Sequence, residues 1–447
     1  MIETNKKSSL PFRPITAVVA NEKGEIFDLA GYAAVGCDGP VQACLCVEET
    51  RNLPHGSELM YLPDRVPLVY DLQSNAVVAM AENPYEPGEA IFPVAAFNSP
   101  GYVITHTGAW EERSRAVPLP LFSYGAVGWH RGKFRSAVLQ VDKEPRQDLR
   151  RMPADKVAAG VQDLRQTLAG NRLSAHLENC ALNYGCPAGK NFFLGRYEAP
   201  LPTATTCNAG CLGCLSLQSD KAISCSQERI AFTPSPEEIA QVAMTHIKRV
   251  KQAVVSFGQG CEGDPLMAAD TITRAIRKIR SQTDQGTINM NTNGSLPDKI
   301  EALLDAGLDS LRISMNSLRK VCYTAYFRPR GYGFGDVLES IDLALQAGAH
   351  VAINYLNCPG FNDTPEEGAA LMDFIDQHPI SMIQWRNLNF DPLRYLLAMN
   401  RAARHSRPTG VRRLLDGTKK AFPHLRFGYF NPPKEKFTHV RHPAGLN

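Results

Sequence analysis

The sequence has no apolar run near the roughly 20 residues that a membrane-spanning helix requires, which argues against an integral membrane protein. Residues 1–12 are polar and lysine-bearing with no apolar signal core behind them, so we expect no secretory signal. The formal net charge of +3 is too small to indicate a partner by itself. Twelve cysteines in 447 residues are too sparse for a disulfide framework and indicate reduced thiols and metal ligation. We therefore expect a cytoplasmic protein.

The length of 447 residues and mass of 49.1 kDa indicate two or three domains. A hydrophobic fraction of 44% and a charged fraction of 21% are typical of a globular protein with substantial cores. We divide the chain into a β-rich module that is a candidate for substrate recognition, a helical connector containing Cys180 and Cys186, a core of alternating strands and helices, and a basic C-terminal extension. Their ranges are 1–150, 151–197, 198–400 and 401–447.

The N-terminal module shows short β-prone runs separated by Pro, Gly and Asn clusters. Residues 15–20 and 25–29 flank Asn21-Glu-Lys-Gly24, which predicts a β-hairpin. A sandwich or barrel-like β domain is expected here. The sequence pattern changes from strand-like to helical at Pro153, because residues 154–168 carry apolar side chains at helical spacing.

From about residue 198 onward, strand-like and helical stretches alternate. The first helix is expected at 235–250, where prolines stand only at the entry and acidic residues occupy the first turn. Such alternation predicts parallel strands joined by crossover helices. About six βα units can be counted, fewer than the eight of a closed TIM barrel. The expected fold is therefore α/β, a partial (β/α)6 TIM-type barrel preceded by an N-terminal mainly-β module.

Three cysteines, Cys207, Cys211 and Cys214, form a C-x3-C-x2-C group. Three thiolates at this spacing can hold three irons of a [4Fe–4S] cube and leave the fourth iron without a protein ligand. A cluster that only carries electrons normally has four cysteines, so three indicate a position kept open for another ligand. Zinc is the alternative, because Cys211 and Cys214 can complete a tetrahedral set with Cys180 and Cys186, although Cys207 is then unused.

This spacing resembles the signature of radical S-adenosylmethionine (SAM) enzymes, in which SAM takes the open iron position. The resemblance covers roughly residues 200–391 and includes four motifs in the family's order. It implies a [4Fe–4S] cluster that cleaves SAM reductively to methionine and a 5′-deoxyadenosyl radical, which abstracts hydrogen from a substrate. It also implies a reducing partner such as flavodoxin or ferredoxin.

The run that follows the second expected strand resembles the family's Gly-Glu-Pro segment, which grips the amino group of SAM. Gly263, Asp264 and Pro265 occupy the matching places, with Asp for the usual Glu. Glycines here allow close approach of the backbone to a ligand. An isolated glycine-rich loop is more often a turn, so its position after the cysteine loop is what favours a binding role.

Two further strand ends resemble SAM contacts of the family. Asn293 lies in Asn-Thr-Asn-Gly after the third strand, while Ser314 and Asn316 lie at the end of the fourth. Each residue type is equally common as a cap or a turn former. The sequence departs from the family at Gly213, where an aromatic residue that packs near the adenine usually stands. The adenine must therefore pack against another part of this chain.

Extra cysteines and arginines leave the substrate open. Cys180 and Cys186, with Cys225 or Cys261, can ligate an auxiliary iron–sulfur cluster, and buried structural thiols are the alternative. Arg328 and Arg330 favour recognition of a carboxylate or a phosphate, or else belong to a structural loop. Arg386 and Asn387 can reach the substrate or the methionine carboxylate.

The function expected is thus a radical SAM enzyme of unknown substrate, with a peptide or protein favoured because of the β module. A small acidic metabolite is one alternative, and RNA bound by the basic tail is another. A third alternative is a non-catalytic binding protein that zinc or an iron–sulfur cluster stabilises. The net reaction, the number of clusters and the oligomeric state do not follow from the residues.

Overall fold

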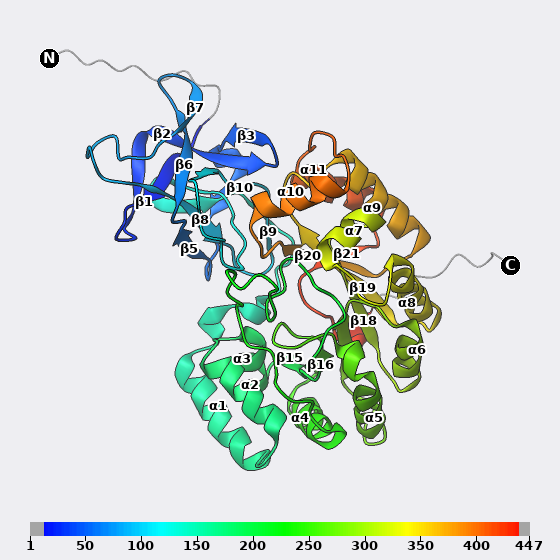
Figure 1. Ribbon diagram of the computed structural model, residues 1–447. Helices are drawn as coiled ribbons and strands as arrows, with labels where there is room; N and C mark the ends of the chain where they lie inside the picture. The colour runs from blue at the N-terminus through cyan, green and yellow to red at the C-terminus, as the bar shows by residue number, and fades with distance from the viewer. Residues whose placement is uncertain (1–12, 438–447) are drawn as a thin grey trace. The chain divides into compact units, whose positions relative to one another are not determined.

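The computed structural model describes residues 13–437, which fall into two compact units (Figure 1). One, the β unit, comprises residues 13–117 and Ser123–Leu139. The other, the barrel unit, comprises Pro118–Phe122 and residues 140–437.

The β unit is built from antiparallel strands, as the sequence predicts. β1 (Thr16–Ala20) pairs with β2 (Ile26–Asp38) through the expected hairpin turn. Gly24 in that turn has a φ of 78°, a left-handed conformation that glycine adopts without strain. β1 also pairs with β8 (Phe92–Phe97) and β12 (Val127–His130). The remaining strands are β3 (Val41–Cys44), β4 (Arg51–Asn52), β5 (Glu58–Tyr61), β6 (Arg65–Asp71), β7 (Ala76–Ala79), β9 (Tyr102–Ile104), β10 (Thr107–Gly108), β11 (Trp110–Glu112), β13 (Lys133–Ser136) and β14 (Val138–Gln140).

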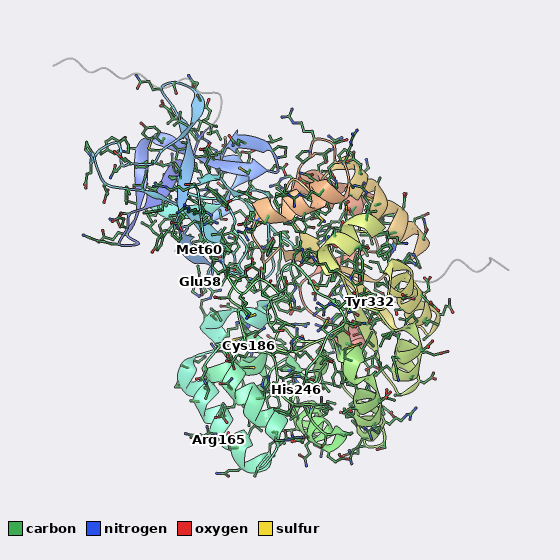
Figure 2. The ribbon with its side chains drawn as sticks, in the orientation of Figure 1. Glu58, Met60, Arg165, Cys186, His246 and Tyr332 are labelled. Atoms are coloured by element: carbon green, nitrogen blue, oxygen red, sulfur yellow. The ribbon has the colours of Figure 1, made fainter. Side chains whose placement is uncertain are left out.

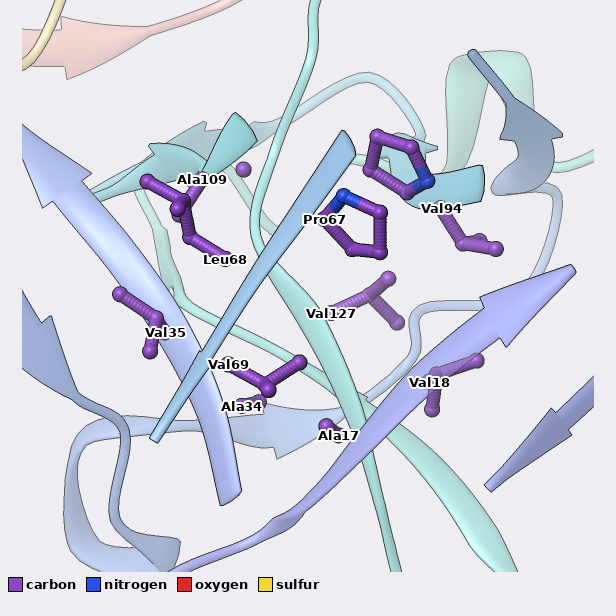
Figure 3. Close-up of a pocket in the computed structure, with 12 residues that line it drawn as sticks. Ala17, Val18, Ala34, Val35, Pro67, Leu68, Val69, Val94, Ala109 and Val127 are labelled. Atoms are coloured by element: carbon purple, nitrogen blue, oxygen red, sulfur yellow. The ribbon is translucent and has the colours of Figure 1, made fainter. Parts of the chain in front are cut away.

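Aliphatic side chains fill the interior of the β unit. Val18, Val35, Leu68, Val94 and Val127 come from five different strands and line a cavity of about 20 Å³ (Figure 3). A cavity of that size holds about one water molecule and is far too small for a substrate or a cofactor.

Three helices open the barrel unit and occupy the expected connector. They are α1 (Ala154–Thr167), α2 (Arg172–Leu182) and α3 (Pro187–Phe193). Gly160 of α1 lies against α3 so closely that a β-carbon would sit 2.3 Å from the carbonyl oxygen of Phe193. The close packing of these helices explains a glycine in a helix interior, where it otherwise costs stability.

A seven-stranded parallel sheet forms the half-barrel of this unit, so the expected partial TIM-type fold is confirmed. Its strands pair in chain order throughout. They are β15 (Glu198–Pro200), β16 (Val254–Phe257), β17 (Thr287–Thr292), β18 (Ser310–Met315), β19 (His350–Asn357), β20 (Met382–Asn387) and β21 (Arg426–Gly428). The helices of the unit after the connector are α4 (Pro236–Arg249), α5 (Ala269–Arg280), α6 (Pro297–Asp305), α7 (Lys320–Phe327), α8 (Phe334–Gln346), α9 (Pro365–Gln377), α10 (Pro392–Ala402) and α11 (Val411–Ala421).

Local sequence sets the helix boundaries. The Ser235 hydroxyl accepts a bond from the Glu238 N–H, while the Glu238 carboxylate accepts one from the Ser235 N–H, a reciprocal capping box at the start of α4. Along the strands, apolar residues such as Leu311 and Ile313 alternate with polar ones such as Arg312. Since successive side chains of a strand point to opposite faces, the apolar set packs under the helices and the polar set lines the inside.

The seventh strand lies in the segment expected to be a basic extension. β21 pairs with β20 in parallel register, and the chain then continues across the amino-terminal end of the half-barrel. There the Asn431 side chain donates to Glu198 (2.8 Å), the Lys434 N–H donates to Thr287 (2.6 Å), and Phe437 stacks on His350 (ring centroids 4.4 Å apart). These three partners are the first residues of β15, β17 and β19. Residues 431–437 thus cover the amino-terminal end of the half-barrel, and we call them the closing segment.

Among the described residues, no helix combines the length and the hydropathy that crossing a bilayer demands.

Candidate cofactor site and barrel interior

The three cysteines lie on the long loop between β15 and α4, which we call the cysteine loop. All three side chains are half-buried. The loop is paired along its backbone with the end of α7: Gly210 N–H donates to Phe327 (2.9 Å), Leu212 N–H donates to Tyr326 (3.1 Å), and Arg330 N–H donates to Asn208 (2.9 Å). The aromatic and basic stretch after β18 therefore braces the cysteine loop through its backbone.

A second brace comes from the loop that follows β16. Gly263 N–H donates to the Ala204 carbonyl (2.7 Å), and Asp264 N–H donates to that of Thr206 (3.0 Å). A β-carbon at Gly263 would lie 1.8 Å from the Thr206 oxygen, a distance that no side chain tolerates. Gly263 is therefore required for the close contact of two backbones immediately before Cys207.

The buried Glu262 side chain holds the cysteine loop and the loop after β16 together. Its carboxylate accepts four backbone N–H bonds, from Thr203 (2.7 Å), Ala204 (2.9 Å), Gly258 (2.7 Å) and Gln259 (2.7 Å). Burial raises the pKa of Glu262 to about 7, while the four N–H donors favour its charged form. This residue joins the start of the cysteine loop to the β16 loop, and the sequence analysis did not single it out.

Asp264 and Asn293, both expected to contact SAM, are joined to each other. The Asp264 carboxylate accepts from the Thr292 hydroxyl (2.6 Å), the Asn293 N–H (2.7 Å) and the Leu266 N–H (3.0 Å). The Asn293 side chain donates to the side chain of Asn208 (2.8 Å), which follows Cys207 directly. Pro265 begins a short 3-10 turn after Asp264. The carboxyl ends of β16 and β17 are thereby tied to the cysteine loop.

Ser314 and Asn316 differ in their surroundings. Ser314 is half-buried on the inner face of β18 and is paired in register with Asn354. Asn316 is fully buried, and its side-chain amide donates to the Cys322 carbonyl (3.3 Å) and the Tyr395 hydroxyl (3.2 Å). The structure thus brings Ser314 to the barrel interior and directs the Asn316 amide to the helices around it.

Gly213, where the family has an aromatic residue, is enclosed by other side chains. A β-carbon there would lie 3.0 Å from the Tyr326 hydroxyl and 3.4 Å from the β-carbon of Phe390. Tyr326 belongs to α7 and is buried. The space beside the last cysteine is therefore filled by an aromatic residue from elsewhere in the chain.

The electrostatic environment of the cysteine loop fits a metal cluster. Burial, with Asp264 nearby, raises the pKa of Cys207 to about 11, and burial raises that of Cys211 above its ordinary value. In the metal-free chain these thiols are neutral, and binding of metal releases their protons. The Arg229 guanidinium donates to the Cys214 sulfur (3.7 Å), a contact that stabilises negative charge on it. Three half-exposed thiols on one loop that is held in place can bind three irons of a [4Fe–4S] cluster and leave the fourth iron without a protein ligand.

The interior of the half-barrel is polar. Near β15, the Asn289 amide donates to Ser256 (3.1 Å) and the Ser310 hydroxyl donates to Asn289 (2.6 Å), while Ser256 donates to Glu198. This network satisfies the inner positions of the first strands. The inward positions of the half-barrel include Ser256, Asn289, Asn291, Ser310, Arg312, Ser314, Asn354, Gln384 and Arg386.

Toward β18–β20, several inward-facing polar atoms are buried and have no hydrogen-bond partner among the described residues. Arg312 Nε, Asn354 Oδ1, both amide atoms of Gln384 and Arg386 Nε have no hydrogen-bond partner among the described residues. Arg312 is 7% exposed, and burial, with the charge of Arg386 close by, lowers its pKa to about 9. The Arg386 guanidinium lies 3.8 Å from the ring centroid of Tyr429. Ser314, Asn354 and Gln384 form one row across three strands between these cations.

Sequence reasoning identified Arg386 but missed Arg312 as a functional candidate. The alternation of polar and apolar residues along β18 was the available signal, because it puts Arg312 on the same face as Ser314. Its proximity to Arg386 depends on how the strands are arranged in the sheet, which the β18 sequence alone does not specify.

Comparison with known proteins places this site in a family. Residues 201–375 match the model of the radical SAM superfamily. The FeMo cofactor biosynthesis protein NifB of Klebsiella pneumoniae is 28% identical over 187 residues, covering 38% of this chain and 39% of that protein. The mitochondrial GTP 3',8-cyclase of Arabidopsis thaliana is 28% identical over 206 residues, covering 44% and 47%. The GTP 3',8-cyclase of Marinobacter nauticus is 30% identical over 169 residues, covering 36% and 48%.

The chain thus spans less than half the length of these curated relatives. The matched region contains the cysteine loop, the β16 loop and strands β16 to β19. Members of this family use a [4Fe–4S] cluster and SAM and require a reductant. Residues 201–375 of this chain thus form a domain similar to that of the radical SAM superfamily.

Proposed function

We propose that this enzyme carries out radical SAM chemistry on a small anionic molecule bound inside the half-barrel. The observation that carries the proposal is a pair of inward-facing guanidinium groups, the buried Arg312 and the half-buried Arg386, which have no carboxylate bonded to them among the described residues. A cation buried without a bonded anion is costly, so two such groups facing one interior favour an anionic ligand. When bound, the cluster and SAM supply hydrogen-atom abstraction by a 5′-deoxyadenosyl radical.

The protein residues have separable roles in this proposal. Cys207, Cys211 and Cys214 hold the cluster. Gly263, Asp264 and Pro265 keep the cysteine loop and the neighbouring strand ends in place and offer backbone groups to the amino group of SAM.

Asn293 and Ser314 offer polar contacts at the strand ends, and Asn316 positions α7 through its bonded amide. Tyr326, beside Gly213, is the proposed packing surface for the adenine ring. Flavodoxin or ferredoxin is the proposed reducing partner.

Substrate recognition is assigned to the row between the two arginines. Ser314, Asn354 and Gln384 present hydroxyl and amide groups, so neutral polar parts of the substrate bind there while its negative group binds Arg312 and Arg386. Two of the relatives are named as GTP cyclases, and GTP is a small polyanion. These names favour a small anionic substrate over the peptide or protein that we expected from the β module.

The RNA alternative loses its main support in the described residues. The basic tail was its basis, yet β21 and the closing segment are bonded into the half-barrel. The described part of the tail therefore packs as part of the half-barrel.

The test measures SAM cleavage that depends on substrate. After anaerobic reconstitution with iron and sulfide and reduction with dithionite, 5′-deoxyadenosine is quantified with GTP and with cell-extract fractions from an anion exchanger. We expect stimulation by GTP or by a retained fraction, and none in the Cys207/Cys211/Cys214→Ala variant. Stimulation by the unretained, peptide-containing fraction alone contradicts an anionic substrate.

The arginine pair is tested in the same assay. Arg312→Gln and Arg386→Gln are each expected to lower the substrate-dependent kcat/KM by about tenfold to a hundredfold, through loss of a buried charge-assisted contact. Arg277→Gln is the matched control, because Arg277 lies exposed on α5. Equal losses in all three variants would contradict a role for the interior pair.

A further inference from the structure

A second set of metal-ligand side chains lies between the connector helices and the β16 loop. His176 and Cys180 are four residues apart on α2, which places them on one helix face, and Cys261 comes from the loop after β16. His176 Nε2 lies 3.5 Å from the sulfur of Cys180 and 3.5 Å from that of Cys261. Within residues 13–437, this is the one set of three His, Cys, Asp or Glu whose ligand atoms all lie within 4.8 Å of one another.

These separations match the edges of a tetrahedron around one ion. Zinc binds sulfur at about 2.3 Å and imidazole nitrogen at about 2.0–2.1 Å, so a tetrahedral site separates nitrogen from sulfur by about 3.6 Å. Both observed nitrogen–sulfur distances are 3.5 Å. The cysteines of a [4Fe–4S] cube bind different iron atoms, which requires a wider spacing of the sulfurs. The geometry therefore favours a single ion over an auxiliary cluster here.

We propose that His176, Cys180 and Cys261 bind one zinc ion, with Cys186 as the fourth ligand. Cys186, labelled in Figure 2, directly precedes α3. Its N–H donates to the Cys180 carbonyl (2.9 Å), which holds the two cysteines together. Cys180, Cys186 and Cys261 also interact electrostatically with one another. The set is Cys₃His, one of the ligand sets of closed structural zinc sites.

Burial agrees with a closed structural site. Cys180 is 2% exposed and Cys261 is 6% exposed, so no open coordination position faces solvent from their side. Free thiols are often buried as small apolar groups, but a histidine nitrogen equidistant from two of them is not explained by apolar packing. Binding exchanges the thiol protons for the ion, and those protons are released to solvent.

The site joins two parts of the barrel unit that no other covalent or metal link connects in the described residues. Cys261 lies directly before Glu262 and Gly263, the residues that hold the start of the cysteine loop. An ion bound there fixes that loop to α2. The zinc site is thus a support for the cofactor site and remains separate from its three cysteines.

The experiment measures metal in full-length protein purified without reconstitution. Cells are grown in defined medium with zinc and iron, and zinc, iron and acid-labile sulfide are determined per chain. The background is the Cys207/Cys211/Cys214→Ala variant, so metal on the cysteine loop does not contribute. We expect about one zinc ion per chain in this background. We expect a loss of about fivefold or more on adding Cys261→Ser or His176→Ala, since structural zinc is bound tightly by its full ligand set.

Cys225→Ser is the matched control, because Cys225 is exposed and lies outside the set; its zinc content should stay at the background level. Cobalt(II) alone is then added to the metal-free background protein, so that folding of the ligand variants is not required. Tetrahedral cobalt bands with thiolate charge transfer are expected.

Three results would overturn the proposal. They are zinc absent from the background variant, iron with sulfide in place of zinc at this set, and a disulfide between Cys180 and Cys261 found by mass spectrometry of protein kept anaerobic throughout.

Discussion

Two buried charged side chains of the barrel unit, Glu262 and Arg312, differ in how their charge is balanced. The Glu262 carboxylate receives four backbone N–H bonds, so its charge is compensated and its role is to fix two loops. The Arg312 side chain is buried as well, but its Nε has no hydrogen-bond partner among the described residues. A compensated ion supports structure, whereas an uncompensated one is maintained at a cost in stability and indicates a ligand.

Replacing Arg312 by a neutral residue should therefore stabilise the ligand-free protein. Arg312→Met removes a buried cation that lies close to Arg386, and we expect a gain of about 1–4 kcal/mol in the free energy of unfolding. Thermal melting of the cofactor-free protein measures it, and the same variant should lose substrate stimulation of SAM cleavage. A lower melting temperature would show that Arg312 is a structural cation, contrary to the proposal.

Two buried histidines should make the barrel unit sensitive to acid. His246 Nε2 lies 3.2 Å from the Tyr197 carbonyl oxygen, its Nδ1 has no hydrogen-bond partner within residues 13–437, and burial lowers its pKa from 6.5 to about 4. Because the folded pKa lies below the unfolded one, its stabilising contribution is complete above pH 6.5 and is lost as the pH falls toward about 4. From about pH 7.5 to about pH 5 the expected loss is about 2 kcal/mol for His246.

His350 behaves in the same way, since burial lowers its pKa to about 4. Urea unfolding at the two pH values measures the combined effect. The His246→Gln variant, whose amide can still donate to Tyr197, should keep about half of the acid sensitivity. An unchanged pH dependence in that variant would contradict the assignment to His246.

At the scale of elements, the sequence predicted what is local and missed what is brought together by folding. The cysteine spacing and the strand-end motifs each lie within a few residues, so their chemistry could be recognised without coordinates. The bracing of the cysteine loop by Tyr326–Arg330, and the filling of the space at Gly213 by Tyr326, join segments over a hundred residues apart. Such contacts leave no periodic signal, and neither does the pairing of Cys261 with His176.

The contact between the β16 loop and the cysteine loop can be tested at Gly263. A β-carbon at Gly263 would overlap the Thr206 carbonyl, so Gly263→Ala should displace one loop at an overpacking cost of about 3 kcal/mol. We expect iron bound after reconstitution to fall to less than about half of the wild-type value, because the three thiols are no longer held together. Iron and sulfide analysis measures this.

Gly335→Ala is the control for that substitution. Gly335 lies in α8 with no atom within 4 Å of the added carbon, so its replacement should leave iron binding unchanged and favour the helix slightly. Full cluster occupancy in Gly263→Ala would mean that the loop contact is not needed to hold the cysteines.

At the scale of the whole barrel unit, its last residues complete the interior. β21 was not expected because three residues with an exposed arginine carry no alternating pattern, and the closing segment has no regular strand or long helix. The fold nevertheless uses both. β21 covers the edge of β20, and the closing segment contacts the first residues of three strands through two hydrogen bonds and one ring stack. The interior that contains Arg312 is therefore closed by residues almost 120 positions later in the chain.

Truncation after Ala421 tests whether this segment belongs to the fold. It removes β21 and the closing segment, so the Glu198 and Thr287 side chains each lose one hydrogen bond and Arg386 loses the ring of Tyr429. Each lost buried bond costs about 1 kcal/mol, and several together should lower the melting temperature of the barrel unit by about 5–10 °C. Substrate stimulation should be lost as well. Truncation after Phe437 is the control, since it keeps every contact named here. If the longer truncation leaves both properties intact and abolishes a salt-sensitive RNA gel shift instead, the tail is a separate nucleic-acid arm.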